Sequence, residues 1–377
     1  AGSPQIGDCL VQTGLPAVVL GSDPPPLADA ANPVVRRVYG HRRFPADWPL
    51  RPQDLDEEQR AVVELLGRNC ARAGDALADD LIAFAREWRP DLVVHDTGAF
   101  AGAVAAAALG IPNVRHLTGV GLRPMERRVA RPEPLPEYAR LFGRRGIPVR
   151  TTPTLTLDPS PPSLRLPVRD PWREVRYVPY NGAAPVPSDV DDDGPPRVCV
   201  TWGYSAARAV VQVGAAALDP FQEALAALDA LDVRPVIVTT TEQLRLLRGR
   251  PGSAEVLAGA PLHLVLPRCA AVLHQCGDGT ALTAAASGTP QLAITRKPDP
   301  ALTADRLANA GAAIHLRYQE LPGGVARIGA IREAVEKLLA DAAYQQGASR
   351  LRAEIERQPP PAALVPVLAR LAAAGSA

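Results

Sequence analysis

Residues 270–294, AAVLHQCGDGTALTAAASGTPQLAI, contain the pattern that decides the fold class. A short apolar run at 270–273 leads into a turn that contains two glycines, Gly277 and Gly279. The residues that follow are small and favour a helix, and a second apolar run begins after a Gly-Thr-Pro breaker. Strand, turn, helix and strand in this order predict a parallel sheet with crossover helices.

The same alternation recurs along the chain. In the first half, the pattern predicts a strand at 91–96, a helix at 101–110 and a strand at 111–117. Residues 118–170 are rich in Arg and Pro, and we expect irregular loops around one or two short helices there. In the second half the pattern predicts strands at 198–203, 234–240, 270–274, 291–295 and 312–316, and helices at 217–229, 241–248, 279–287, 301–310, 325–340, 341–356 and 362–374.

Composition restricts the class of protein. The chain has 377 residues, which is enough for two domains, and its net charge of +1 argues against binding to nucleic acid or a membrane surface through bulk charge. No apolar run reaches the ~20 residues of a membrane span, and no secretion signal is evident. The five cysteines include no CxxC pair, so we expect reduced thiols in the cytoplasm and no metal site.

A change in composition divides the chain. Residues 177–197 are rich in Pro, Gly and acidic residues, which is typical of a linker. The strand and helix alternation resumes directly after it. The sequence therefore predicts two α/β domains, 1–182 and 197–358, joined by a linker at 183–196.

The turn at 275–279 has the properties of an anion site. Glycines let backbone amides approach a ligand closely, and a helix that begins there presents unpaired N–H groups and the positive end of its dipole. We expect Gly279 and Thr280 to donate to phosphate oxygens, with His274 or Gln275 facing the same anion. The alternative is a helix start whose glycines serve only the turn.

The segment 261–294 resembles the donor-binding signature of GT-B glycosyltransferases of the family-1 type. It is most similar to actinomycete enzymes that glycosylate antibiotics and related polyketides. Four further stretches agree in order, so the resemblance covers nearly the whole chain: WRPDLVVHDTGAFAG (88–102), GIPNVRHL (110–117), YVPYNG (177–182) and RLANAGAAIHL (306–316).

The resemblance implies two Rossmann-like parallel-sheet domains that face a cleft. The nucleotide-sugar donor would bind mainly to the C-terminal domain and the acceptor mainly to the N-terminal one. The last segment, 359–377, would return as a helix to the N-terminal domain.

Several family positions differ in this chain. Gln275 stands where the family has the histidine assigned to the diphosphate, and Cys276 replaces a glycine. Asp278 adds a negative charge that would weaken phosphate binding unless its side chain points away. Of the family's Asp-Gln pair that contacts sugar hydroxyls, Asp299 is present and Pro300 replaces the glutamine. The donor-binding residues implied by the resemblance are Gly203, Ser205, Leu262, His274, Gln275, Gly277, Gly279, Thr280 and Asp299.

On the acceptor side, Asp96 closes a predicted strand at the end where ligands of such sheets bind. In the family this aspartate orients a histidine that removes the acceptor's proton, and we expect Asp96 near the floor of the cleft. The alternative is a cap for the helix that begins near Gly98. We expect His95, Phe100 and His116 to line the acceptor cleft.

The beginning of the sequence, AGSPQIGDCLVQTGLPAVVLG, resembles the family segment that follows the second strand. The first strand–helix–strand unit, which carries the base histidine, is absent from the sequence. We expect the real protein to contain these residues ahead of Ala1.

The resemblance implies an inverting glycosyltransferase that moves a deoxysugar from a nucleoside diphosphate, dTDP, to a polyketide-type hydroxyl. It implies no cofactor and no metal, and its partners would be the nucleotide sugar, a small aglycone and a possible second copy of the chain. One alternative is a catalytically silent homologue that binds a nucleotide sugar or a partner enzyme, which Gln275 and Pro300 favour. A nucleotide-sugar epimerase of the same fold is disfavoured by the acceptor-side resemblance.

Overall fold

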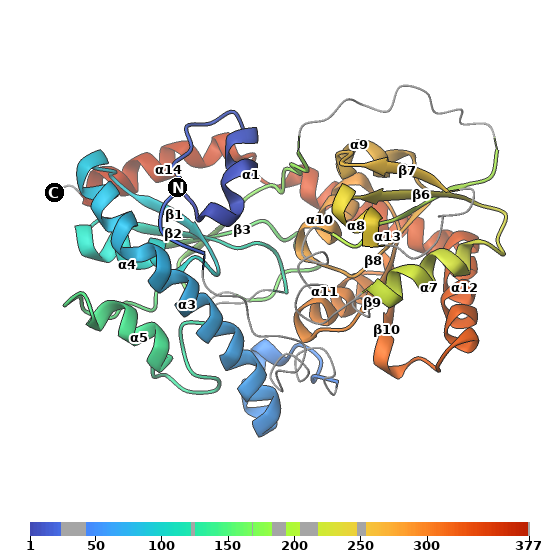
Figure 1. The fold of residues 1–377 in the computed structure, drawn as a ribbon, viewed down its shortest axis with the longest axis horizontal. Coiled ribbons are helices and arrows are strands. Elements are labelled where there is room, and N and C mark those ends of the chain that lie inside the picture. The colour runs from blue at the N-terminus through green and yellow to red at the C-terminus, as the bar shows by residue number, and fades with distance from the viewer. Residues whose placement is uncertain are drawn as a thin grey trace.

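Two parallel sheets, each covered by helices, form the two domains of the molecule (Figure 1). The structure is a computed structural model, and it describes residues 1–23, 43–121, 125–167, 169–182, 194–203, 218–246 and 254–375. Most of the proposed linker, 183–193, lies outside the described residues. The expectation of two parallel α/β domains is confirmed, whereas the exact domain boundaries stay a prediction.

The N-terminal sheet has four parallel strands in the order β1-β2-β3-β4. The predicted strands at 91–96 and 111–117 are present as β1 (Val93–Asp96) and β2 (Asn113–His116). The expectation of loops and short helices alone at 118–170 is wrong. That stretch contains the helix α5 (Pro136–Gly143) but also the strand β3 (Leu155–Asp158), and β4 (Trp172–Glu174) follows it.

Two helices pack together beside this sheet. The helix α3 (Glu57–Trp88) begins at Asp56, whose carboxylate accepts from Gln59 N while the Gln59 side chain accepts from Asp56 N, a capping box. The helix α4 (Phe100–Leu109) ends at Gly110, which has the left-handed φ of 72° that favours glycine. A short helix, α1 (Gly7–Gln12), lies near the N-terminus.

The C-terminal sheet has six parallel strands in the order β10-β9-β8-β5-β6-β7. Every strand and helix predicted for this half is present, and β7 and α9 are additional. The strands are β5 (Arg197–Val200), β6 (Arg234–Thr239), β7 (Glu255–Ala258), β8 (Ala271–His274), β9 (Gln291–Thr295) and β10 (Ala313–Arg317). The helices are α7 (Asp219–Leu228), α8 (Thr241–Leu246), α9 (Leu262–Val265), α10 (Asp278–Ser287), α11 (Pro298–Asn309), α12 (Val325–Ala340) and α13 (Ala342–Arg357).

The last helix, α14 (Pro361–Gly375), lies against the N-terminal sheet, at the opposite side of the molecule from α12 (Figure 1). Leu364 is buried in one apolar cluster with Val114 of β2 and Leu157 of β3. Where the chain returns, Arg176 N donates to Pro359 O at 2.8 Å. The chain therefore crosses between the domains twice, at adjacent points.

Apolar and polar contacts join the two domains. One buried cluster combines Trp48 and Val63 from the N-terminal side with Leu282 and Leu351 from the C-terminal side. The Arg306 guanidinium of α11 donates to the Asp47 carboxylate at 2.9 Å across the same interface. Within the part of the chain that the structure describes, no helix is long and apolar enough to cross a membrane.

Candidate donor and acceptor sites

The start of α10 lies at the carboxyl end of β8, in the middle of the C-terminal sheet between β5 and β9. The turn from strand to helix is tight, and Cys276 adopts a φ of 63°, in the left-handed region that favours glycine. The glycine that the resemblance implies at this position would adopt such a φ without strain. The strained turn brings the first amides of α10 to the sheet edge where ligands of parallel sheets bind.

These amides are open to an incoming ligand. Among the described residues, no side chain caps the helix at Gly277. Gly279 is exposed, and a Cβ placed on it would meet no atom within 4 Å. An uncapped start of a ten-residue helix offers N–H donors and a positive dipole end, which suit an anion such as a phosphate.

Three of the sequence-predicted donor residues surround this helix start. Gly203, which has a φ of 65°, comes from the loop after β5. A Cβ on Gly203 would lie 3.2 Å from Gln275 Nε2 and 3.7 Å from Thr280 Oγ1. Gly203, Gln275 and Thr280 therefore meet at one point, and Gly277 and Gly279 adjoin them. The absence of a side chain at Gly203 keeps this space open.

The sequence analysis missed Gln243, which fixes the position of Gly203. Gln243 is buried, its Nε2 donates to Gly203 O at 2.6 Å, and its Oε1 accepts from Thr239 Oγ1 at 2.9 Å. Gln243 also forms a capping box with Thr240 at the start of α8. The signal that would have found it is the Thr-x-x-Gln spacing directly after a strand.

Of the two residues expected to face the anion, His274 or Gln275, His274 lies inside the domain. Its side chain is fully buried, and Nδ1 accepts from Cys276 N at 3.1 Å. Burial lowers the pKa of His274 to about 4, so the imidazole is neutral at physiological pH. His274 therefore shapes the turn from inside the domain.

The remaining residues predicted to bind the donor differ in how far their side chains are exposed. Asp299, in the first turn of α11, is partly buried, and desolvation raises the pKa of its carboxyl. The Leu262 side chain is buried in the apolar core, so only its backbone is left for ligand contacts. His263 N beside it donates to Asn181 Oδ1 at 3.1 Å. Ser205 lies outside the described residues.

The Asp96 carboxylate holds the turn between β1 and α4. Its Oδ1 accepts from Gly98 N at 2.7 Å and from Ala99 N at 2.8 Å, just ahead of α4. The residue is exposed, and within the described part of the chain its Oδ2 makes no hydrogen bond. Asp96 therefore holds the turn that precedes α4, while the N-cap of the helix itself is Ala99 and has no side-chain cap; the second oxygen of Asp96 is left for another partner.

Two of the three residues expected in the acceptor cleft belong to the core. The Phe100 ring packs edge-to-face on Tyr138, with 4.8 Å between ring centroids, and is 1% exposed. His95 is buried under α4, and its Nδ1 donates to Asp96 O at 2.8 Å. Burial lowers the pKa of His95. His116 is partly buried and donates through Nδ1 to Leu117 O at 2.8 Å.

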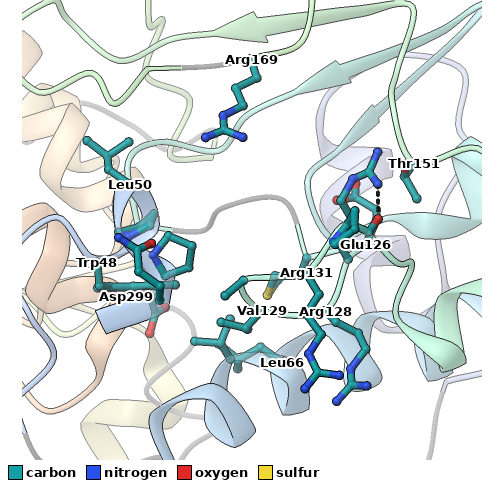
Figure 2. A pocket seen from close by; sticks show the side chains of 18 of the residues that line it. Trp48, Leu50, Leu66, Glu126, Arg128, Val129, Arg131, Thr151, Arg169 and Asp299 are labelled. Carbon is teal, nitrogen blue, oxygen red and sulfur yellow. Dashed lines mark hydrogen bonds between the residues drawn. The ribbon is translucent and has the colours of Figure 1, made fainter. Parts of the chain in front are cut away.

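A cavity of about 810 Å³ lies instead between the N-terminal domain and the start of α11 (Figure 2). Its apolar walls come from Trp48 and Leu50 on one side and from Leu66 and Val129 on another. Asp299 lies beside Trp48 and Arg169 extends toward the open space, as Figure 2 shows. This volume is within the range of ordinary small-molecule sites.

Arginines outnumber carboxylates around the cavity. Among the described lining residues, Arg115 is buried and pairs with Glu126 and, at 3.1 Å, with Asp170. Burial raises the pKa of Glu126 even though Arg115 opposes the shift. The charged lining residues are Arg115, Arg127, Arg128, Arg131, Arg169, Glu126, Asp170 and Asp299.

Comparison with known families identifies this arrangement. The chain matches the N-terminal domain model of erythromycin biosynthesis protein CIII-like proteins over residues 1–203, and the C-terminal domain model over 222–371. The protein belongs to the EryCIII-like family. It is a glycosyltransferase of the GT-B fold, as the sequence resemblance implied.

Curated relatives and solved structures support this family assignment. The chain is 34% identical to TDP-daunosamine transferase DnrS of Streptomyces peucetius, over 99% of this chain and 90% of the relative. It is 33% identical to 10-deoxymethynolide desosaminyltransferase of Streptomyces venezuelae, over the same shares. The spinosyn rhamnosyltransferase SpnG complexed with thymidine diphosphate has a TM-score of 0.75 and 29% identity, covering 98% of this chain and 90% of SpnG. The family favours an active enzyme over the silent homologue.

The buried, neutral His274 predicts a pH dependence of folding. Its pKa falls from 6.5 to about 4 on folding, so its contribution to stability is full above pH 6.5 and is lost as the pH falls toward 4. We expect His274→Asn, which keeps an acceptor near Cys276 N, to remove about 2 kcal/mol of the stability difference between pH 7.5 and 5. Urea unfolding of both proteins at the two pH values measures it; parallel pH profiles would contradict the assignment.

Proposed function

We propose that this EryCIII-like glycosyltransferase moves a deoxysugar from dTDP to a hydroxyl of a polyketide aglycone, with inversion at the anomeric carbon. The observation that carries the proposal is the open, uncapped start of α10 beside Gly203. The names of the relatives, which include a TDP-daunosamine transferase and a tylactone mycaminosyltransferase, support the substrate classes. All five cysteines are free, which favours a reducing, cytoplasmic compartment.

In this proposal the diphosphate lies at the start of α10. The amides of Gly279 and Thr280 donate to phosphate oxygens, and Gln275 adds its side-chain amide. Because Gln275 is neutral, the helix dipole and the amides carry most of the stabilisation of the leaving group. Asp299, which faces the cavity, is our candidate for the sugar hydroxyls.

The aglycone lies in the cavity between the domains. The apolar walls at Trp48, Leu50 and Leu66 suit a hydrophobic ring system. The excess of arginines favours an acceptor with carbonyl or phenol oxygens over a basic acceptor. Both proposed substrates then meet near Asp299, which lines the cavity at the donor side.

The chemistry is a direct displacement. The acceptor oxygen attacks the anomeric carbon, the bond to the dTDP oxygen breaks, and the diphosphate leaves with the electron pair. The acceptor must lose its proton, and a base for it needs a partner that orients it. We propose that Asp96 is that positioning partner, because its Oδ2 remains available while Oδ1 holds the loop.

A branched side chain at the helix start tests the donor site. Gly279→Val places methyl groups where the proposed phosphate lies, and no protein atom is within 4 Å to cause a clash. We expect dTDP affinity to fall at least tenfold, ~1.4 kcal/mol. Gly329→Val in α12, where a Cβ also meets nothing within 4 Å, is the matched control. Calorimetric titration measures both; equal affinities in folded variants would refute the site.

Filling the cavity tests the acceptor site. Leu66→Trp adds bulk from α3 into the cavity, and we expect the acceptor KM to rise about tenfold while dTDP affinity stays unchanged. Leu65→Trp, one position earlier on the same helix and outside the described lining residues, is the control. An unchanged acceptor KM in Leu66→Trp would exclude this cavity as the acceptor site.

A charge change at Asp96 separates a role in catalysis from a role in the turn. The amide oxygen of Asn accepts hydrogen bonds as the carboxylate does, so Asp96→Asn keeps the bonds to Gly98 and Ala99 but removes the charge. We expect turnover to fall about 10²–10⁴-fold, with dTDP affinity and melting temperature nearly unchanged. If turnover stays at the wild-type value, Asp96 serves only to hold the turn.

A further inference from the structure

We propose that Asp278 is a positioning residue that holds the N-terminal loop 117–121 against the donor helix α10. The inference rests on the proposed donor and acceptor sites, and it assigns a role as hydrogen-bond acceptor to an acidic side chain that phosphate binding does not explain. An acidic side chain in the first turn of a phosphate-binding helix opposes the donor, because like charges repel. Its side chain must therefore serve another contact.

The Asp278 carboxylate joins three elements. Its Oδ1 accepts from Gly121 N at 3.0 Å, in the loop after β2, and from Thr303 Oγ1 of α11 at 3.0 Å. Its Oδ2 lies 3.5 Å from Thr118 Oγ1, at the limit of a hydrogen bond. The carboxylate thus points toward the N-terminal domain, while the helix amides of α10 remain open on their other side.

The loop is built to let Asp278 approach. A Cβ on Gly119 would lie 2.6 Å from Asp278 Cγ, and a Cβ on Gly121 would lie 2.7 Å from Asp299 O. Real Cβ atoms do not come so close, so both positions require glycine. Val120 between them is 1% exposed and packs in the apolar cluster that spans the two domains. The loop therefore lies close to α10 at Gly119 and close to α11 at Gly121.

This contact sets the geometry between the two substrates. Gly121 and Asp299 both line the cavity, and Asp278 belongs to the helix that we propose for the diphosphate. The carboxylate therefore connects the donor helix to the acceptor cavity directly. Loss of the contact should shift the acceptor relative to the anomeric carbon, whereas the donor keeps all of its own ligands.

Kinetics of three variants test the role. We expect Asp278→Ala to lower kcat/KM for the acceptor about ten- to a hundredfold, the loss expected for two or three hydrogen bonds, with dTDP affinity unchanged or higher. Asp278→Asn keeps an acceptor for Gly121 N and should stay within about threefold of wild type. Asp219→Ala removes an acid from the first turn of α7 and controls for the helix dipole.

The role is overturned if Asp278→Ala keeps the wild-type kcat/KM, or if its dTDP affinity falls in parallel with turnover. It is also overturned if Asp278→Asn is as impaired as Asp278→Ala. Gly119→Ala attacks the same contact from the other domain and should reproduce the loss of turnover with unchanged dTDP affinity.

Hydrogen exchange tests the contact without substrates. The Gly121 amide donates to Asp278, so deuterium uptake of the peptide that covers 117–121 should rise in Asp278→Ala and not in Asp219→Ala. Equal uptake in Asp278→Ala and wild type would overturn the proposal even if the protein transferred no sugar. Raised uptake in a protein that neither binds dTDP nor turns over would instead place the failure in the proposed function.

Discussion

The open start of α10 is the constraint on which the rest of the site depends. A helix start must satisfy its first amides with a cap, with water or with a ligand, and here no cap is provided among the described residues. The neighbours are arranged accordingly. Cys276 adopts a left-handed conformation, which makes the turn short. Gly203 leaves space beside Gln275 and Thr280, and Asp278 directs its carboxylate toward Gly121 N of the N-terminal domain. Each of these features costs local stability or restricts the sequence, and each keeps the amides accessible.

Much of the fold follows from the sequence because parallel strands in this chain are short apolar runs bounded by turn residues. The C-terminal domain shows this most clearly, since its predicted helices and strands are all present. The elements of the N-terminal domain were predicted less completely. The strand β3 is four residues long and buried on both faces, so it has no alternation. The long helix α3 was not predicted either, although its buried residues, among them Ala71, Gly74 and Ala78, recur every three or four positions as expected for a helix.

The sequence predicted the parts of the candidate site that depend on backbone conformation. It could not predict the parts that depend on the direction in which a side chain points. The positions of Gly203 and Gly279 at the open helix start follow from turn chemistry, which is local. The direction of His274 does not, because every residue of β8 is buried and the sequence gives no inward and outward alternation. The cavity that we propose for the acceptor is built by residues distant in sequence, such as Trp48 and Arg169, which only the folded chain brings together.

The two crossings between the domains have a mechanical consequence. Arg176 donates from its backbone N to Pro359 O at 2.8 Å and from Nε to Gln358 O at 3.2 Å, so the outgoing and returning chains are tied at one point. The Arg306–Asp47 ion pair and the apolar cluster around Trp48 and Leu282 join the same two domains, so this tie is one of several restraints on their relative position. Separation of the domains would therefore have to break the bonds between the two chain crossings as well as the contacts of the interface.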